Sequence, residues 1–179
     1  MKLFKFLRGD GPATAPQDED PDRVTLVAPI GGRLVELDEV PDPVFAGRIL
    51  GDGFAIDPSE GVLRAPFTGE VTSVHAARHA VTLRAKNGAE VLMHIGVDTV
   101  ALGGRGFRAH VSRGDRVRAG DPLVTFDAAS LRASVPSLAI PVILTDGDDF
   151  VIEARAATGT VAAGERCCVL APRPAAAPD

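Results

Sequence analysis

The sequence predicts an all-β protein: an antiparallel β-sandwich or flattened barrel built from a duplicated motif and preceded by a short amphipathic N-terminal tail. Short runs rich in Val, Ile, Leu and Thr are separated by Gly and Pro roughly every 8 to 12 residues, as is typical of such folds. Two different sequence motifs each occur twice. The 19 glycines and 14 prolines leave little room for long helices.

The apolar runs predict short strands, and eight examples are each bounded by turn-forming residues. They cover residues 24–27, 33–37, 53–56, 70–74, 80–85, 90–95, 122–126 and 139–144. Residues 128–134 have room for only one or two helical turns.

A tight hairpin is predicted between residues 80–85 and 90–95, because the Asn87-Gly88 pair tolerates the positive φ angles of such turns. With these two residues as the loop, residue i faces residue 175 − i, so position 81 faces His94 and His79 lies on a diagonal from it. Diagonal neighbours on one sheet face are roughly 7–8 Å apart at Cα. The pattern therefore predicts that the two imidazoles lie together.

The duplicated motifs indicate two similar half-units. The string APIGGRL at 28–34 matches APFTGEV at 65–69 and the two residues that follow, and VRAGD at 117–121 matches VAAGE at 161–165. Each half alone would leave an apolar sheet face exposed to water, so we expect the halves to pack on one another.

The first eight residues predict a short basic amphipathic helix, the pattern of an interfacial membrane contact. At about 100° per residue, Leu3, Phe4, Phe6 and Leu7 fall on one side, and the basic residues at positions 2, 5 and 8 fall on the other. We expect residues 1–22 to be this tail and a disordered linker, 23–172 to be the folded domain, and 173–179 to be a disordered C-terminal tail.

Composition excludes several function classes. The net charge of −5 and the absence of Trp and Tyr argue against nucleic-acid binding. No apolar run approaches the roughly 20 residues of a membrane-spanning helix. Cys167 and Cys168 are adjacent and therefore poorly placed to pair. We expect them to be small buried hydrophobic residues, in a protein of the reducing cytoplasm.

Paired neutral imidazoles at His79 and His94 could act as nucleophile, acid or metal ligand; in one such role, one ring attacks phosphorus while the other donates a hydrogen bond to the phosphoryl oxygens. The alternative is that both are ordinary histidines whose hydrogen bonds are satisfied within the fold. We expect His75 and His110 to be plain surface histidines.

Five strings in order and spacing resemble the glucose-type enzyme IIA of the bacterial phosphoenolpyruvate:sugar phosphotransferase system. They are VPDPVFA at 40–46, GDGFAI at 51–56, APFTG at 65–69, HAV at 79–81 and HIGVDTV at 94–100, followed by Gly106-Phe107. The resemblance covers about residues 24–170 and implies an all-β sandwich, in agreement with the repeat.

The resemblance also implies roles for individual residues. His94 would accept a phosphoryl group from the carrier HPr through Nε2 and pass it to the cysteine of a sugar-specific IIB domain of a IIB/IIC permease, and His79 would steady the phosphate. A partner-binding surface would comprise Asp42, Val44, Phe45, Ile49, Leu50, Asp98 and Val100. Permeases or kinases are possible regulatory targets, and the short N-terminal tail matches the family's membrane anchor.

The sequence departs from the family at a few positions. Ala77 stands where the family usually has a threonine that would help to orient an imidazole. Leu92 and His75 stand where the family often has phenylalanine. The Cys-x-Thr-Arg-Leu-Arg string of a IIB domain is absent, so Cys167 and Cys168 are not expected to carry phosphate.

Two other classes remain as alternatives. A zinc peptidase of the lysostaphin type would share the fold, but its His-x-His string fails at His94, where Leu92 stands two residues earlier. A lipoyl or biotinyl carrier would need a modified lysine, and Lys86 lacks the usual flanking residues. We expect no cofactor within the chain, except that His79 and His94 could share a zinc ion with a carboxylate from another protein.

Overall fold

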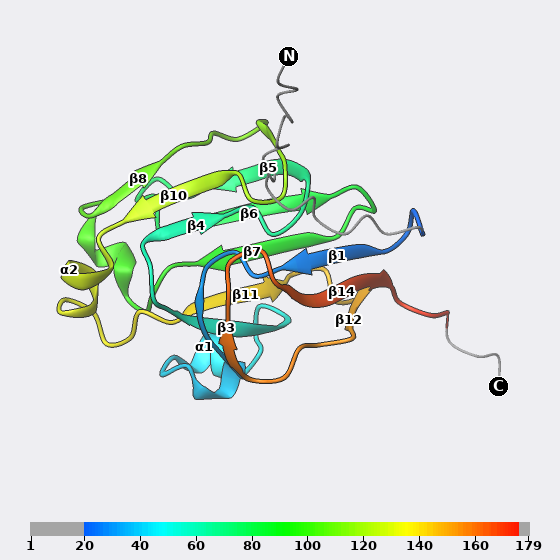
Figure 1. The fold of residues 1–179 in the computed structure, drawn as a ribbon, viewed down its shortest axis with the longest axis horizontal. Helices are drawn as coiled ribbons and strands as arrows, with labels where there is room; N and C mark the ends of the chain where they lie inside the picture. Colours follow the sequence, from blue (N-terminus) through cyan, green and yellow to red (C-terminus); the bar gives the residue numbers. More distant parts are fainter. Residues whose placement is uncertain (1–19, 176–179) are drawn as a thin grey trace, which may run out of the picture.

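The computed structural model describes residues 20–175, which form fourteen strands and four short helical turns (Figure 1). The tail residues Leu3, Phe4, Phe6 and Leu7 lie outside the described residues. The elements in chain order are β1 (Val24–Val27), β2 (Gly32–Val35), η1 (Leu37–Glu39), α1 (Pro43–Ala46), β3 (Asp52–Pro58), β4 (Val62–Arg64), β5 (Gly69–Val74), β6 (Ala80–Ala85), β7 (Glu90–His94), η2 (Thr99–Leu102), β8 (Phe107–Ala109), β9 (Arg116–Val117), β10 (Pro122–Phe126), α2 (Ala128–Arg132), β11 (Ile140–Leu144), β12 (Phe150–Glu153), β13 (Gly159–Val161) and β14 (Arg166–Pro172).

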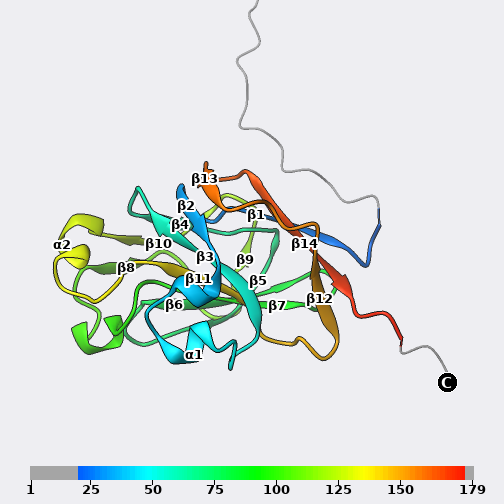
Figure 2. The same ribbon diagram turned by 90° about the horizontal axis from the view of Figure 1, so that it is seen from below.

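The strands form one large sheet and two small ones. The large sheet has the order β13-β2-β3-β11-β7-β6-β5-β9, and the small sheets are β1-β14-β12 and β4-β10-β8. Figure 2 shows β1 and β4 on one side of the molecule and β6 and β7 on the other. The prediction of an all-β sandwich is confirmed. The described strands close no barrel, because β13 and β9 remain separate edges of the large sheet.

The larger apolar core lies between these sheets. It contains Leu26 from β1, Leu63 from β4, Leu83 from β6, Met93 from β7 and Leu123 from β10, each 1 % exposed or less. A smaller buried cluster forms around Phe45 of α1. No helix in the described part of the chain is long and apolar enough to cross a membrane.

The duplicated motifs occupy equivalent places in the large sheet. Gly32 of β2 pairs with Val161 of the edge strand β13, and Gly69 of β5 pairs with Val117 of the opposite edge strand β9. The backbone bonds repeat as well: Gly164 donates to the Ala28 carbonyl at 2.9 Å, and Gly120 donates to the Ala65 carbonyl at 2.8 Å. The two half-units predicted from the sequence are thus related halves of one sandwich.

The register predicted for the β6–β7 hairpin is wrong by one residue. Ala85 donates to the Ala89 carbonyl at 2.8 Å and Gly88 donates to the Ala85 carbonyl at 3.0 Å, so the loop has three residues, not two. The Asn87 side chain accepts a bond from the Ala89 amide at 3.1 Å, which stabilises this longer loop. Ala80, not residue 81, therefore faces His94.

The first and last described strands are β1 and β14. β1 begins one residue after the predicted start at residue 23, and β14 ends at Pro172. Arg173, assigned to the C-terminal tail, still donates its amide to the Asp149 carbonyl at 2.7 Å. The predicted helical turns at 128–134 are α2, capped by Asp127, whose carboxylate accepts from the Ser130 amide at 3.0 Å.

Candidate functional site

Two histidine rings meet at one end of the β6–β7 hairpin. His94 is the last residue of β7, and His79 precedes β6, where its carbonyl accepts a bond from the Ile95 amide at 2.7 Å. Their ring centroids are 4.7 Å apart, with the rings at 75° to each other. A shift of one residue in register would move each residue of a paired strand to the other face of the sheet. His79 lies outside β6, so this shift does not turn its ring away from His94. The predicted proximity of the two rings is therefore confirmed despite the different register.

The orientation of His94 is set by its own loop. Its Nδ1 lies 2.8 Å from the carbonyl oxygen of Gly96, so Nδ1 carries the proton and donates. Gly96 has a φ of 72°, and a Cβ at this position would lie only 2.8 Å from a methyl carbon of Thr99. Phe45 packs against the imidazole with the ring centroids 5.1 Å apart. Nε2 therefore presents its lone pair away from the loop.

The electrostatic surroundings keep His94 in the neutral, nucleophilic form. Burial lowers the pKa of His94 below its ordinary value, and this outweighs the Gly96 hydrogen bond and the charge of Asp42, both of which raise it. A neutral imidazole with its proton on Nδ1 is the form that can attack an electrophile through Nε2.

His79 is more deeply enclosed. It is 3 % exposed, and its Nδ1 is buried without a hydrogen-bond partner. Ala77 supplies no hydroxyl here, in keeping with the departure noted in the sequence. Burial, together with the nearby charges of His94 and His75, lowers the pKa of His79 to about 4. The ring is thus neutral at physiological pH, with Nε2 left as the nitrogen that can meet a ligand.

This depressed pKa predicts a pH-dependent stability. Because the unfolded chain binds a proton near pH 6.5 and folded His79 only near 4, stability falls as the pH drops through that window. We expect the free energy of unfolding of the wild type, relative to that of His79→Gln, which lacks the titrating group, to fall by about 3 kcal/mol between pH 7 and pH 4. Urea unfolding of both proteins at several pH values measures this, and a constant difference would contradict it.

Exposed apolar side chains gather on the elements beside His94. Among residues 20–175 the exposed large hydrophobic side chains are Val44 (38 %), Ile49 (71 %), Leu50 (40 %) and Val100 (53 %). All four were predicted for the partner surface. Phe45, predicted for the same surface, is only 5 % exposed, because it packs inward from α1 against the imidazole of His94.

Acidic groups lie at the edge of this apolar surface. The Asp42 carboxylate caps α1 by accepting from the Val44 amide at 2.8 Å and from the Phe45 amide at 3.4 Å. Asp98 is exposed and precedes η2 in a left-handed conformation with a φ of 60°. The two aspartates therefore begin the two short helical turns that carry Val44 and Val100.

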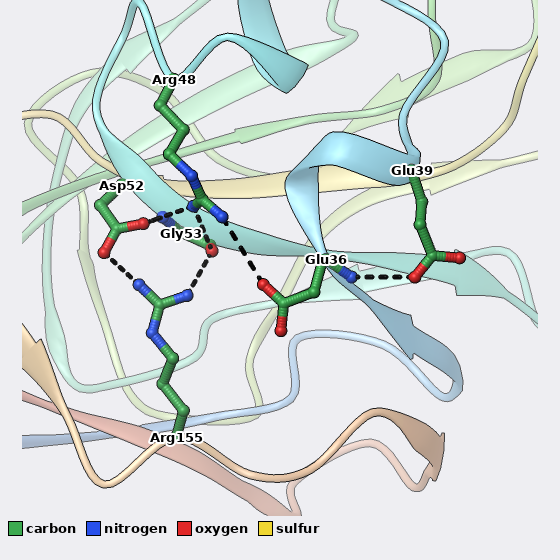
Figure 3. A network of polar contacts seen from close by, with 6 residues as sticks. All are labelled: Glu36, Glu39, Arg48, Asp52, Gly53 and Arg155. Atoms are coloured by element: carbon green, nitrogen blue, oxygen red, sulfur yellow. Dashed lines mark hydrogen bonds and ion pairs between the residues drawn. The ribbon is translucent and has the colours of Figure 1, made fainter.

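A polar network braces the loop that carries Ile49 and Leu50 (Figure 3). Arg48 contacts the carboxylate of Asp52 at 2.5 Å and that of Glu36 at 3.6 Å, and Arg155 contacts Asp52 from the other side. Burial alone would raise the pKa of Asp52, but the hydrogen bond and charge of Arg155 hold it below its ordinary value. The ionised carboxylate thus ties both arginines to the start of β3.

The two cysteines and the remaining two histidines lie outside the His79–His94 pair. Cys167 and Cys168 are buried, free thiols whose pKa values burial raises to about 12, so neither is a nucleophile at neutral pH. His110 is exposed, with its Nε2 2.7 Å from the Thr125 hydroxyl oxygen. His75 is exposed too, as predicted, yet its ring touches that of His79, a contact the sequence analysis missed.

No metal site stands out in the part of the chain that the structure describes. Residues 20–175 contain no group of three or more His, Cys, Asp or Glu side chains placed to hold a metal ion. The pair His79 and His94 would need at least one ligand from a partner, so a shared zinc ion stays a prediction.

A family model described as phosphoenolpyruvate-dependent sugar phosphotransferase system, EIIA 1, matches residues 24–150. The chain belongs to this EIIA family. It is 45 % identical over 146 residues to the PTS system glucose-specific EIIA component of Bacillus cereus, covering 82 % of this chain and 84 % of that protein. The counterpart from Halalkalibacterium halodurans is 43 % identical over 161 residues, covering 89 % and 93 %.

A solved structure gives the same answer for the fold of this EIIA protein. It is similar to glucose permease IIA from Mycoplasma capricolum, with a TM-score of 0.79 and 39 % sequence identity over 82 % of this chain and 95 % of that one. The protein is a phosphocarrier component of a sugar phosphotransferase system. The peptidase and lipoyl or biotinyl alternatives find no support.

Proposed function

We propose that His94 of this EIIA protein accepts a phosphoryl group from the phosphohistidine of HPr and transfers it to the cysteine of a sugar-specific IIB domain. The observation that carries the proposal is the bond from His94 Nδ1 to the Gly96 carbonyl, 2.8 Å long, which leaves the Nε2 lone pair free beside a second neutral imidazole. HPr and the IIB domain of the permease would both meet this protein on the cytoplasmic side of the membrane.

The phosphoryl transfer needs no cofactor in this chain, because each bond that forms is matched by one that breaks. The Nε2 lone pair of His94 attacks phosphorus, the P–N bond of the donor breaks, and the imidazole of HPr leaves with the bonding electron pair. The Nδ1 proton stays in place, and its bond to Gly96 stabilises the positive character of the phosphorylated ring. In the second step a IIB thiolate attacks phosphorus and the neutral imidazole of His94 is the leaving group.

His79 steadies the phosphoryl group in both steps. With its proton on Nε2, this ring donates a hydrogen bond to a phosphoryl oxygen. The bond stabilises the negative charge of the phosphoryl group, which the low-dielectric site would otherwise leave uncompensated. Its depressed pKa keeps it a neutral donor rather than a fixed positive charge that would hold the phosphoryl group too firmly.

The surface around His94 suits short-lived docking of both partners. An exposed apolar patch with an acidic edge excludes water from the transfer site, while the carboxylates of Asp42 and Asp98 attract basic partner residues. The same patch serves HPr and IIB in turn, so neither complex can be long-lived.

The direct test is incubation with phosphoenolpyruvate, Mg²⁺, enzyme I and HPr, followed by intact-mass measurement under alkaline conditions that preserve phosphohistidine. We expect the mass of one phosphoryl group on the wild type and on the surface control His110→Ala. A chain that stays unmodified while HPr is fully phosphorylated would overturn the proposal.

Ile49 offers a test of the docking surface. This side chain is 71 % exposed, so Ile49→Ser should change the free energy of unfolding by less than about 0.5 kcal/mol. Because central apolar contacts dominate binding, we expect the KM for phosphorylated HPr to rise about tenfold with little change in kcat. The control Thr145→Ala lies at the opposite end of β7, where Thr145 donates its amide to the Glu90 carbonyl. An unchanged KM for Ile49→Ser would remove Ile49 from the surface.

A further inference from the structure

His79 has a second aromatic neighbour, His75, which follows β5. The two ring centroids are 4.3 Å apart at an angle of 60°, closer than the 4.7 Å between His79 and His94. His79 is therefore held between two imidazole rings. One of them belongs to the phosphoryl site, and the other is exposed to solvent.

The ring of His75 is not a free surface side chain. Its Nδ1 accepts a bond from the Ala77 amide at 3.2 Å. Its backbone amide donates to the Ala80 carbonyl at 2.9 Å, and its carbonyl accepts from the Arg78 amide at 2.7 Å. Arg78 has a left-handed φ of 59°, which turns the chain back toward the sheet. These bonds fix His75 across the turn from His79.

The other means of orienting His79 is missing. A buried imidazole is ordinarily oriented by a hydrogen bond at the nitrogen that does not face the ligand. Here that nitrogen, Nδ1, is buried without a partner, and Ala77 has no hydroxyl to offer one. The ring is 3 % exposed, so the packing of its neighbours must determine its orientation.

We propose that His75 is a positioning residue for phosphoryl transfer, which holds the His79 ring with Nε2 toward His94 and keeps water away from Nδ1. The proposal rests on the proposed function. In protein interiors an unpaired acceptor is tolerated better than an unpaired N–H donor, so a dry Nδ1 favours the tautomer with the proton on Nε2. That is the tautomer that can donate to a phosphoryl oxygen.

Removal of the ring should change both orientation and tautomer. In His75→Ala, water reaches Nδ1 and can accept a hydrogen bond from an Nδ1–H group. This stabilises the other tautomer, in which Nε2 carries no hydrogen and cannot donate to a phosphoryl oxygen. We expect transfer from phosphorylated His94 to IIB to slow about 10- to 100-fold, since such a loss is typical of a misplaced active-site group. His75→Phe retains a flat ring against His79 and should keep a rate within about threefold of the wild type.

The decisive measurement is ¹⁵N NMR of the His79 ring nitrogens in the full-length, unphosphorylated protein. We expect one neutral tautomer with the proton on Nε2 in the wild type and in His75→Phe, and a mixture in His75→Ala. Unchanged His79 signals in His75→Ala, or a mixture in both variants, would overturn the proposal. Because the spectra require no phosphate, failure of His94 to accept a phosphoryl group would disprove the proposed function without affecting this test. His110→Ala controls for the loss of an exposed histidine.

Discussion

Replacement of His94 by glutamine is expected to abolish phosphoryl acceptance, with an initial rate at least about 10⁴-fold below that of the wild type. Losses of that size follow the removal of a nucleophile from a site whose other groups remain in place. Glutamine is of similar length and its amide can still donate to the Gly96 carbonyl, but it has no basic lone pair to attack phosphorus. The rate of ³²P incorporation from phosphorylated HPr measures the effect.

Two controls separate this loss of chemistry from a loss of structure. His94 is half-buried at the end of β7, so His94→Gln should retain the thermal unfolding midpoint of the wild type within a few degrees. It should also compete with the wild type for phosphorylated HPr, because Ile49, Leu50 and Val100 are untouched. Normal labelling of His94→Gln would place the phosphoryl group on another residue.

The fold could be predicted because its strongest signals are local. The duplicated Ala-Pro-x-x-Gly motif places a glycine at Gly32 and Gly69, where each strand meets a partner from the second motif. Short strands were harder to predict. β9 has two residues and β13 has three, so neither shows a measurable alternation, and their pairing depends on long-range contacts.

The error in the hairpin register also has a physical reason. Asn-Gly favours a two-residue loop, but a three-residue loop that ends with a glycine of positive φ satisfies the same preference. Gly88 has a φ of 99°, and the Asn87 side chain closes the longer loop. The choice between the two loops depends on which residues of β6 and β7 face the core, and this is decided by the whole sandwich.

The resemblance indicated which residues surround His94, but not how deeply each side chain is buried. The exposure of Val44 and the burial of Phe45, its neighbour on α1, depend on which way a four-residue helix is turned. So short an element shows no reliable periodicity. The contact of His75 with His79 likewise depends on the left-handed turn at Arg78, and a β-strand pattern gives no sign of such a turn.

Replacement of His79 by alanine is expected to separate the two half-reactions. His94 retains its nucleophilic Nε2 and its bond to Gly96, so labelling driven by excess phosphoenolpyruvate should still reach one phosphoryl group per chain. Transfer from that intermediate to IIB should fall about 10²-fold, because the loss of one donor to developing negative charge typically costs this much.

The difference arises because the two measurements report different quantities. The extent of labelling reports an equilibrium, which the donor drives to completion even over a higher barrier, whereas the rate of transfer reports the barrier itself. Rapid-quench transfer to purified IIB measures that rate, with His110→Ala as control. A His79→Ala protein that transfers at the wild-type rate would mean that the second ring only packs against the first. A protein that cannot be labelled at all would mean instead that His79 is needed to shape the site around His94.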